Sequence, residues 1–162
     1  MANLLALYNK LERWPLGRWL FSRAVCWKAP YFSTISPLIT VLENGRCEAV
    51  FADRRRVRNH LGTVHAIALC NLAELTAGVM TDASLPKGMR WIPKGMAVQY
   101  LKKAKGRMLG VATTSTRALV ASESGYELPV TVDVFDQSGE RVFSAEIRMW
   151  LSPRKVQGPD AA

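Results

Sequence analysis

The sequence predicts an α+β fold in which a curved antiparallel sheet of about six strands surrounds one long central helix, preceded by a helical arm. Three observations support this prediction. Residues 64–80 are apolar on every face of a helix, later segments alternate apolar and polar residues as strands do, and helix-forming residues dominate positions 1–28. A helix that is apolar all round must be covered by protein. Only a curved sheet covers most of its circumference.

A length of 162 residues is typical of one domain. We divide the chain into an arm at 1–30, a main domain at 31–152 and a flexible tail at 153–162, where prolines are frequent and apolar residues are few. No apolar run is long enough to span a membrane, and polar residues interrupt the first apolar segment before a secretory signal can form. The expected location is the cytoplasm.

The elements follow in order along the chain. Two helices are expected at 3–13 and 16–28, because Pro15 and Gly17 interrupt the helical pattern. The pair Asn44-Gly45 is typical of a tight hairpin. Strands are expected at 34–42 and 46–52 on either side of this pair, and at 95–104, 107–117, 125–136 and 140–151 after the long helix. This order of elements describes a hotdog fold.

The arm contains Trp14, Trp19 and Trp27 among several basic residues. Such a mixture suits the surface of a membrane. Aromatic anchors more often serve cores and interfaces. Packing over the domain or a partner subunit is therefore the favoured interpretation, and peripheral membrane contact is the alternative.

The net charge of +9 favours anionic partners. Two basic clusters stand out: Arg54, Arg55, Arg56 and Arg58, and Lys102, Lys103, Lys105 and Arg107. Neither cluster contains the interleaved aromatic residues of a nucleic-acid surface, so a phosphate-bearing ligand is the better candidate. The three cysteines lack the paired spacing of a zinc or redox site and are expected to be free thiols. No metal site is expected around the two histidines.

Glu74 is the one carboxylate inside the apolar helix. Burial would raise its pKa toward the range of a general base. From His65 to Glu74 a helix advances roughly 13 Å and turns through about half a circle, so one copy cannot easily bring both to one reacting carbon. A site built from these residues should therefore span a dimer.

The segment Asn59-x-x-Gly62-Thr63-x-His65, followed by Ala73-Glu74, resembles the active-site segment of hotdog-fold acyl-CoA thioesterases of the phenylacetate-pathway type. The resemblance implies catalytic roles for Asn59, His65 and Glu74 across a homodimer or a tetramer. The chain departs from the family where Ala66 and Ile67 replace two glycines, and where Glu74 replaces the more common Asp. The Ala66 amide, at the first turn of the helix, still offers an N–H to an oxyanion. The paired N-terminal helices resemble an uncharacterised thioesterase-like branch of the superfamily.

The predicted function is thus hydrolysis of a fatty or aromatic acyl thioester, with coenzyme A as part of the substrate and no separate cofactor. The two basic clusters suit either the phosphates of coenzyme A or an acidic carrier protein. Two alternatives stay open. One is a non-catalytic acyl-CoA or lipid-binding module in which Glu74 is structural. The other, a hydroxyacyl thioester dehydratase using His60 and Glu74, is disfavoured because the Pro-Gly turn of those enzymes is absent. The acyl pocket is expected among Ala66, Leu69, Cys70 and Ala73, with Trp91 or Tyr100 near its end.

Overall fold

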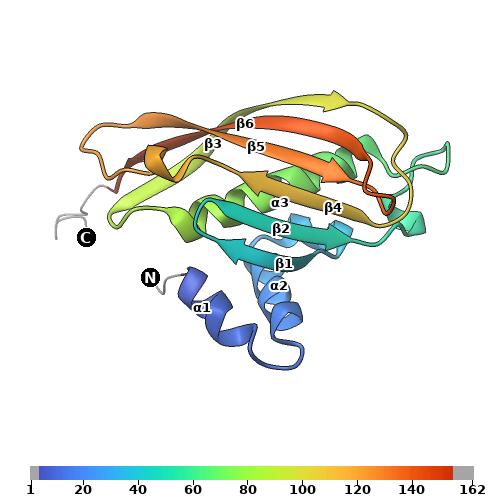
Figure 1. Cartoon of the computed structure of the whole chain (residues 1–162), viewed down its shortest axis with the longest axis horizontal. Helices are drawn as coiled ribbons and strands as arrows, with labels where there is room; N and C mark the ends of the chain where they lie inside the picture. The colour runs from blue at the N-terminus through green and yellow to red at the C-terminus, as the bar shows by residue number, and fades with distance from the viewer. Residues whose placement is uncertain (1–3, 155–162) are drawn as a thin grey trace, which may run out of the picture.

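A long helix, α3 (Ala66–Ser84), packs against one face of a six-stranded sheet in the computed structural model, which describes residues 4–154 (Figure 1). The strands are β1 (Leu38–Glu43), β2 (Arg46–Phe51), β3 (Met89–Tyr100), β4 (Met108–Thr113), β5 (Tyr126–Phe135) and β6 (Arg141–Pro153). Neighbouring strands are antiparallel and lie in the order β1-β2-β4-β5-β6-β3. The chain therefore crosses to the far edge of the sheet after α3. β3 forms that edge and β1 the other, in agreement with the predicted hotdog fold.

Two helices and a short 3-10 helix precede the sheet: α1 (Leu4–Leu11), α2 (Gly17–Lys28) and η1 (Pro30–Ile35). An added Cβ at Gly17 would lie 1.6 Å from the Leu11 carbonyl oxygen, so α2 can begin this close to the end of α1 only with glycine there. α2 packs against β1, and the arm lies on the β1 side of the sheet (Figure 1).

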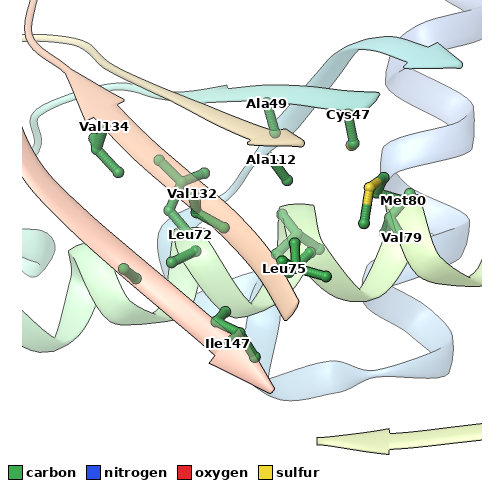
Figure 2. Close-up of a cluster of buried hydrophobic side chains, with 14 of the residues drawn as sticks. Cys47, Ala49, Leu72, Leu75, Val79, Met80, Ala112, Val132, Val134 and Ile147 are labelled. Carbon is green, nitrogen blue, oxygen red and sulfur yellow. The ribbon is translucent and has the colours of Figure 1, made fainter. Parts of the chain in front are cut away.

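The core fills the space between α3 and the inner face of the sheet. Figure 2 shows its labelled members: Leu72, Leu75, Val79 and Met80 from α3, and Cys47, Ala49, Ala112, Val132, Val134 and Ile147 from four strands. The alternation predicted for the last two strands is confirmed, since in β5 Val130 and Val132 are buried while Thr131 between them is exposed. At Gly110 of β4 an added Cβ would lie 2.8 Å from Leu72 Cγ, so this glycine permits the close approach of α3.

Several predicted boundaries are wrong. The first strand begins at Leu38 because residues 30–35 form η1. β3 begins at Met89 and not at residue 95. A proline would disrupt a regular ladder of strand hydrogen bonds, but the pairing of β3 with β6 is irregular between Pro93 and Gly95, so the strand continues through Pro93. Residues 101–107 form an irregular loop. The long helix starts at Ala66, two residues later than predicted, because the chain is still extended at His65.

The prediction of free cysteines is confirmed: Cys26 and Cys47 are buried and Cys70 is half-buried, all unpaired. No helix within residues 4–154 is long and apolar enough to cross a membrane. The predicted tail at 153–162 begins with Pro153 and Arg154, of which Pro153 ends β6. The remainder of that tail lies outside the described residues.

Candidate active site

Asn59 shapes the loop that leads into α3. Its side-chain oxygen accepts hydrogen bonds from the amides of Leu61 at 3.0 Å and Thr63 at 3.2 Å, and its side-chain nitrogen donates to Thr63 Oγ1 at 2.9 Å. Gly62 closes the turn at a φ of 75°, where glycine is favoured. Both polar atoms of Asn59 are thus engaged inside the loop, and the residue sets the path of the chain toward His65.

His65 caps the first turn of α3. Its backbone is extended and Nδ1 accepts a hydrogen bond from the Ile67 amide at 3.0 Å. In the neutral imidazole the proton therefore lies on Nε2. The cap uses the amide of the second helical residue. Ala66 comes first in the helix, so its N–H has no acceptor within α3 and is available to a ligand.

Glu74 lies on a narrow stripe of α3 that the sheet leaves uncovered. The stripe consists of Ile67, Cys70 and Glu74, which follow one another at helical spacing; Glu74 is exposed and the Ile67 side chain is 53% exposed. The sheet of a single copy thus covers most of the circumference of α3, as predicted, and leaves this stripe open. Glu74 therefore lies on a surface that is open to solvent in the single chain, on the same stripe as the exposed Ile67 side chain.

The edge strand β3 borders this stripe. The β3 residues Met96 and Tyr100 pair with Ile147 and Phe143 of β6, whose side chains are buried, so they stand on the same side of the sheet as α3. The Tyr100 hydroxyl lies 3.3 Å from Cys70 Sγ. This hydrogen bond, followed by burial, raises the pKa of Tyr100 to about 12. Tyr100 therefore stays protonated at neutral pH.

The residues proposed to line an acyl pocket are divided between core and surface. Leu69 and Ala73 are buried, whereas Cys70 and Tyr100 contact each other at the stripe. Trp91 packs over Gly78 and donates a hydrogen bond from Nε1 to Asp82 at 2.7 Å. It therefore covers α3 just beyond Glu74.

A cavity of about 190 Å³ opens on the other side of Ile67. It is lined by Tyr31, Thr34 and Ile35 of η1, by Arg56 and Val57 of η2 (Arg55–Val57), by Arg58, and by His65, Ile67, Ala68 and Asn71. Clefts that enclose a whole drug-sized ligand measure roughly 300–1,000 Å³. This cavity has room for only part of an acyl-CoA.

Asn71 lines this cavity and was not singled out from the sequence. Asn71 is 5% exposed; its nitrogen donates to Thr34 Oγ1 at 2.9 Å, and its oxygen has no hydrogen-bond partner among the described residues. Buried acceptors in proteins are usually paired, by water or ligand if not by protein. The sequence feature that could have identified Asn71 is its position as a polar amide in an apolar helix, three residues before Glu74.

The two basic clusters lie in neighbouring segments. Asp53 joins them, because its carboxylate accepts from Arg58 Nε at 2.7 Å and from the Gly106 amide at 3.0 Å. The hydrogen bond from Arg58 lowers the pKa of Asp53, and the Gly106 amide contributes in the same direction. The Val57 carbonyl accepts from the His65 amide, so the first cluster also adjoins the start of α3. Within the second cluster, Lys102 pairs with Glu140.

The cationic side chains of both clusters are directed toward solvent. All eight residues named from the sequence are exposed: Arg54, Arg55, Arg56, Arg58, Lys102, Lys103, Lys105 and Arg107. Arg56 donates to Ser36 Oγ, at the edge of the cavity wall formed by η1. Positive charge therefore gathers at the end of α3 where the Ala66 amide is free.

His60 is exposed in the loop before α3, and no hydrogen bond to it is found within residues 4–154. The same part of the chain has no group of three or more His, Cys, Asp and Glu side chains that could hold a metal ion.

Comparisons with known proteins agree with this fold. Residues 17–151 match the model of a domain of unknown function designated DUF4442. A crystal structure from a structural genomics programme is 44% identical to the chain, with a TM-score of 0.81, and the alignment covers 94% of this chain and 100% of the other. No curated protein is significantly similar in sequence.

More distant structures carry functional descriptions. A Pseudomonas aeruginosa protein of unknown function, described as a probable thioesterase, has a TM-score of 0.75 at 21% identity and covers 82% of this chain and 93% of its own. A thioesterase family protein from Silicibacter pomeroyi has a TM-score of 0.68 at 15% identity, over 82% of this chain and 96% of its own. These likenesses confirm the predicted hotdog fold.

Proposed function

Because the chain belongs to the DUF4442 family and has a thioesterase-like hotdog fold, we propose that it hydrolyses acyl thioesters, with coenzyme A as the leaving group. The observation that carries this proposal is Glu74, a carboxylate on an uncovered stripe of an otherwise buried helix. A carboxylate in such a place can activate water or attack a carbonyl directly.

Two copies of the chain would complete the site. The Ala66 amide and Glu74 are eight residues apart on α3, which is roughly 12 Å along the helix axis. Groups that act on one carbonyl must lie within about 3.5 Å of the reacting atoms. One copy cannot meet this condition with both groups. Glu74 of one copy and the Ala66 amide of the other can both reach one carbonyl if the two α3 helices lie side by side in opposite directions.

The edge of the sheet supports such a dimer. β3 is a twelve-residue strand bonded on one side only, to β6, and exposed edges of this kind pair readily with another strand. Around it, Ile67, Met96 and Tyr100 are large, exposed and apolar. A second copy joined at β3 would cover this surface and remove Glu74 from bulk solvent.

The reaction follows from these groups. Glu74 accepts a proton from a water molecule while the water oxygen attacks the thioester carbonyl carbon. The Ala66 N–H, at the positive end of α3, stabilises the oxyanion. The tetrahedral intermediate collapses as the C–S bond breaks, and the departing thiolate takes the proton held by Glu74, which gives free thiol and carboxylic acid and restores the Glu74 carboxylate. His65 positions the first turn of α3 through its cap, and Asn59 holds the loop behind it.

The basic clusters provide the anion site that a coenzyme A ester needs. They adjoin the start of α3, so phosphates held there would leave the pantetheine arm directed toward Ala66. The small cavity beside Ile67 and Asn71 suits the thioester end of the substrate, since the unpaired Asn71 oxygen can accept a hydrogen bond.

The test is thiol release from short, long and aromatic acyl-CoA esters and from an acyl-carrier thioester. Glu74→Gln, which keeps the size of the side chain, is compared with Glu127→Gln, an exposed carboxylate on β5. We expect kcat to fall about 100-fold to 10,000-fold in the first variant alone, with binding of a non-hydrolysable acyl-CoA retained. Absence of release from every ester by folded wild-type protein would refute hydrolysis. Binding without turnover would identify a non-catalytic module.

A further inference from the structure

The inner face of the helical arm packs against the sheet and the neighbouring helix. This packing fixes which side chains lie on the outer face of the arm. Tyr8 of α1 donates a hydrogen bond to the Thr40 carbonyl at 2.8 Å and packs edge-on against Phe21 of α2, with ring centres 5.1 Å apart. Ser22 accepts from the Ile39 amide at 2.9 Å. Tyr8, Phe21 and Ser22 are all buried. The arm is therefore held in one orientation.

The outer face of the arm exposes most of its large apolar side chains. Trp27 is 88% exposed, Leu16 75% and Trp14 70%, and Trp19 and Leu20 are also exposed. The sequence favoured packing of these tryptophans over the domain or over a partner subunit, and the first of these is wrong because the single chain leaves them exposed. These side chains are spread along the arm from the turn before α2 to the end of α2. Large apolar side chains exposed along one element indicate a site of contact with a membrane or another protein.

The turn between α1 and α2 directs two of these side chains outward. Leu16 has a φ of 64°, a left-handed conformation that is uncommon for leucine, and Trp14 lies two residues before it. Hydrogen bonds from Trp14 N to Leu11 O and from Gly17 N to Trp14 O, both 2.9 Å, hold the turn. In Figure 1 this turn forms the lowest point of the molecule, away from β5 and β6.

The charge of the arm is strongly asymmetric. Between residues 4 and 28 there are five cations, Lys10, Arg13, Arg18, Arg23 and Lys28, against one anion, Glu12. Arg23 is half-buried and donates to the Pro37 carbonyl at 2.7 Å, so the exposed cations are the other four. Glu12 is paired with Arg18 at 3.4 Å. Tryptophan and leucine side chains beside lysine and arginine suit the boundary between acyl chains and headgroups, where the rings enter the interface and the cations meet lipid phosphates.

We propose that the α1–α2 arm binds the surface of a membrane that contains anionic lipid, with Trp14, Leu16 and Trp27 in the headgroup region. The charge complementarity selects this occupant over a second copy of the chain. A twofold contact of arm on arm would bring together two surfaces of the same net positive charge, which repel each other. The free strand edge, which suits a second copy, belongs to β3, whereas the arm packs on β1 at the other edge.

This surface does not depend on the proposed hydrolysis, but it has a consequence for it. Tyr31 is 67% exposed, follows α2 closely in the chain and lines the cavity beside Ile67. A membrane bound to the arm would therefore lie near one wall of the candidate site.

The experiment measures sedimentation of the full chain with vesicles of phosphatidylcholine alone and of phosphatidylcholine mixed with phosphatidylserine. We expect binding to the mixed vesicles only, a blue shift of tryptophan fluorescence, and release by high salt. Lys10→Gln/Arg13→Gln should weaken binding about 30-fold, because each cation near such a surface contributes about fivefold. The double substitution Trp14→Ser/Trp27→Ser should abolish binding to the mixed vesicles.

The matched control is Arg90→Gln/Arg117→Gln, which removes two exposed cations outside the arm. Circular dichroism verifies that each variant is folded. Equal loss of binding in the control pair would show a nonspecific effect of net charge and overturn the proposal, as would absence of wild-type binding to mixed vesicles. A smaller sedimenting mass for the tryptophan variant, with vesicle binding unchanged, would assign the arm to a protein interface and also overturn it.

Discussion

Replacing His65 by alanine removes the side-chain cap of α3, because the Ile67 amide loses its 3.0 Å hydrogen bond to Nδ1. Loss of an N-terminal cap costs about 1 kcal/mol of unfolding free energy, within a range of about 0.5–2 kcal/mol. In a domain of this length that corresponds to a fall of about 3 °C in Tm. His65→Asn keeps an acceptor at the cap, so we expect its Tm to remain within about 1 °C of the wild type.

Thermal denaturation followed by circular dichroism measures this difference, and hydrolysis kinetics measured in parallel separate two roles of His65. If His65 only positions the Ala66 amide, His65→Ala lowers kcat with little change in KM, and His65→Asn restores most of it. Equal destabilisation by Asn and Ala would refute the capping argument. A stable His65→Asn protein without turnover would mean that the imidazole itself contacts the substrate.

Two further predictions concern stability. Tyr8→Phe removes the hydrogen bond to the Thr40 carbonyl but keeps the ring against Phe21, so we expect a loss of about 1 kcal/mol in chemical denaturation; an unchanged midpoint would contradict this. Asp53 has a lowered pKa in the folded state, so its contribution to stability is present above the unfolded pKa of about 3.9 and is lost as pH falls through the folded pKa. The stability of Asp53→Asn should therefore fall less than that of the wild type between about pH 5 and about pH 3. Parallel pH profiles for the two proteins would refute this assignment.

Local patterns in the sequence were sufficient to predict the type of fold. The apolar segment around Leu72 has no polar face, and β5 alternates around Val130 and Val132, so burial specifies a central helix and a half-buried strand. Asn44-Gly45 specifies the hairpin between β1 and β2, where Gly45 has a φ of 77°. These features depend on residues close together in the chain, and they can be recognised without knowledge of the tertiary structure.

The candidate site was predictable only as a segment. The sequence identifies residues 59–74 by their spacing, but contacts between distant residues decide what surrounds them. Asn71 meets Thr34 across 37 positions, Cys70 meets Tyr100 across 30, and Asp53 reaches Gly106 across 53. Periodicity carries no information about such pairs.

The same limit applies to exposure. The pattern of apolar residues places Glu74 in a covered helix and the arm tryptophans against protein, yet one stripe of α3 and the outer face of the arm remain open in the single chain. The pattern of apolar residues in the local sequence indicates which residues favour burial. The tertiary structure decides which of them its own sheet can reach, because six strands that begin at β1 and end at β3 do not close around the helix.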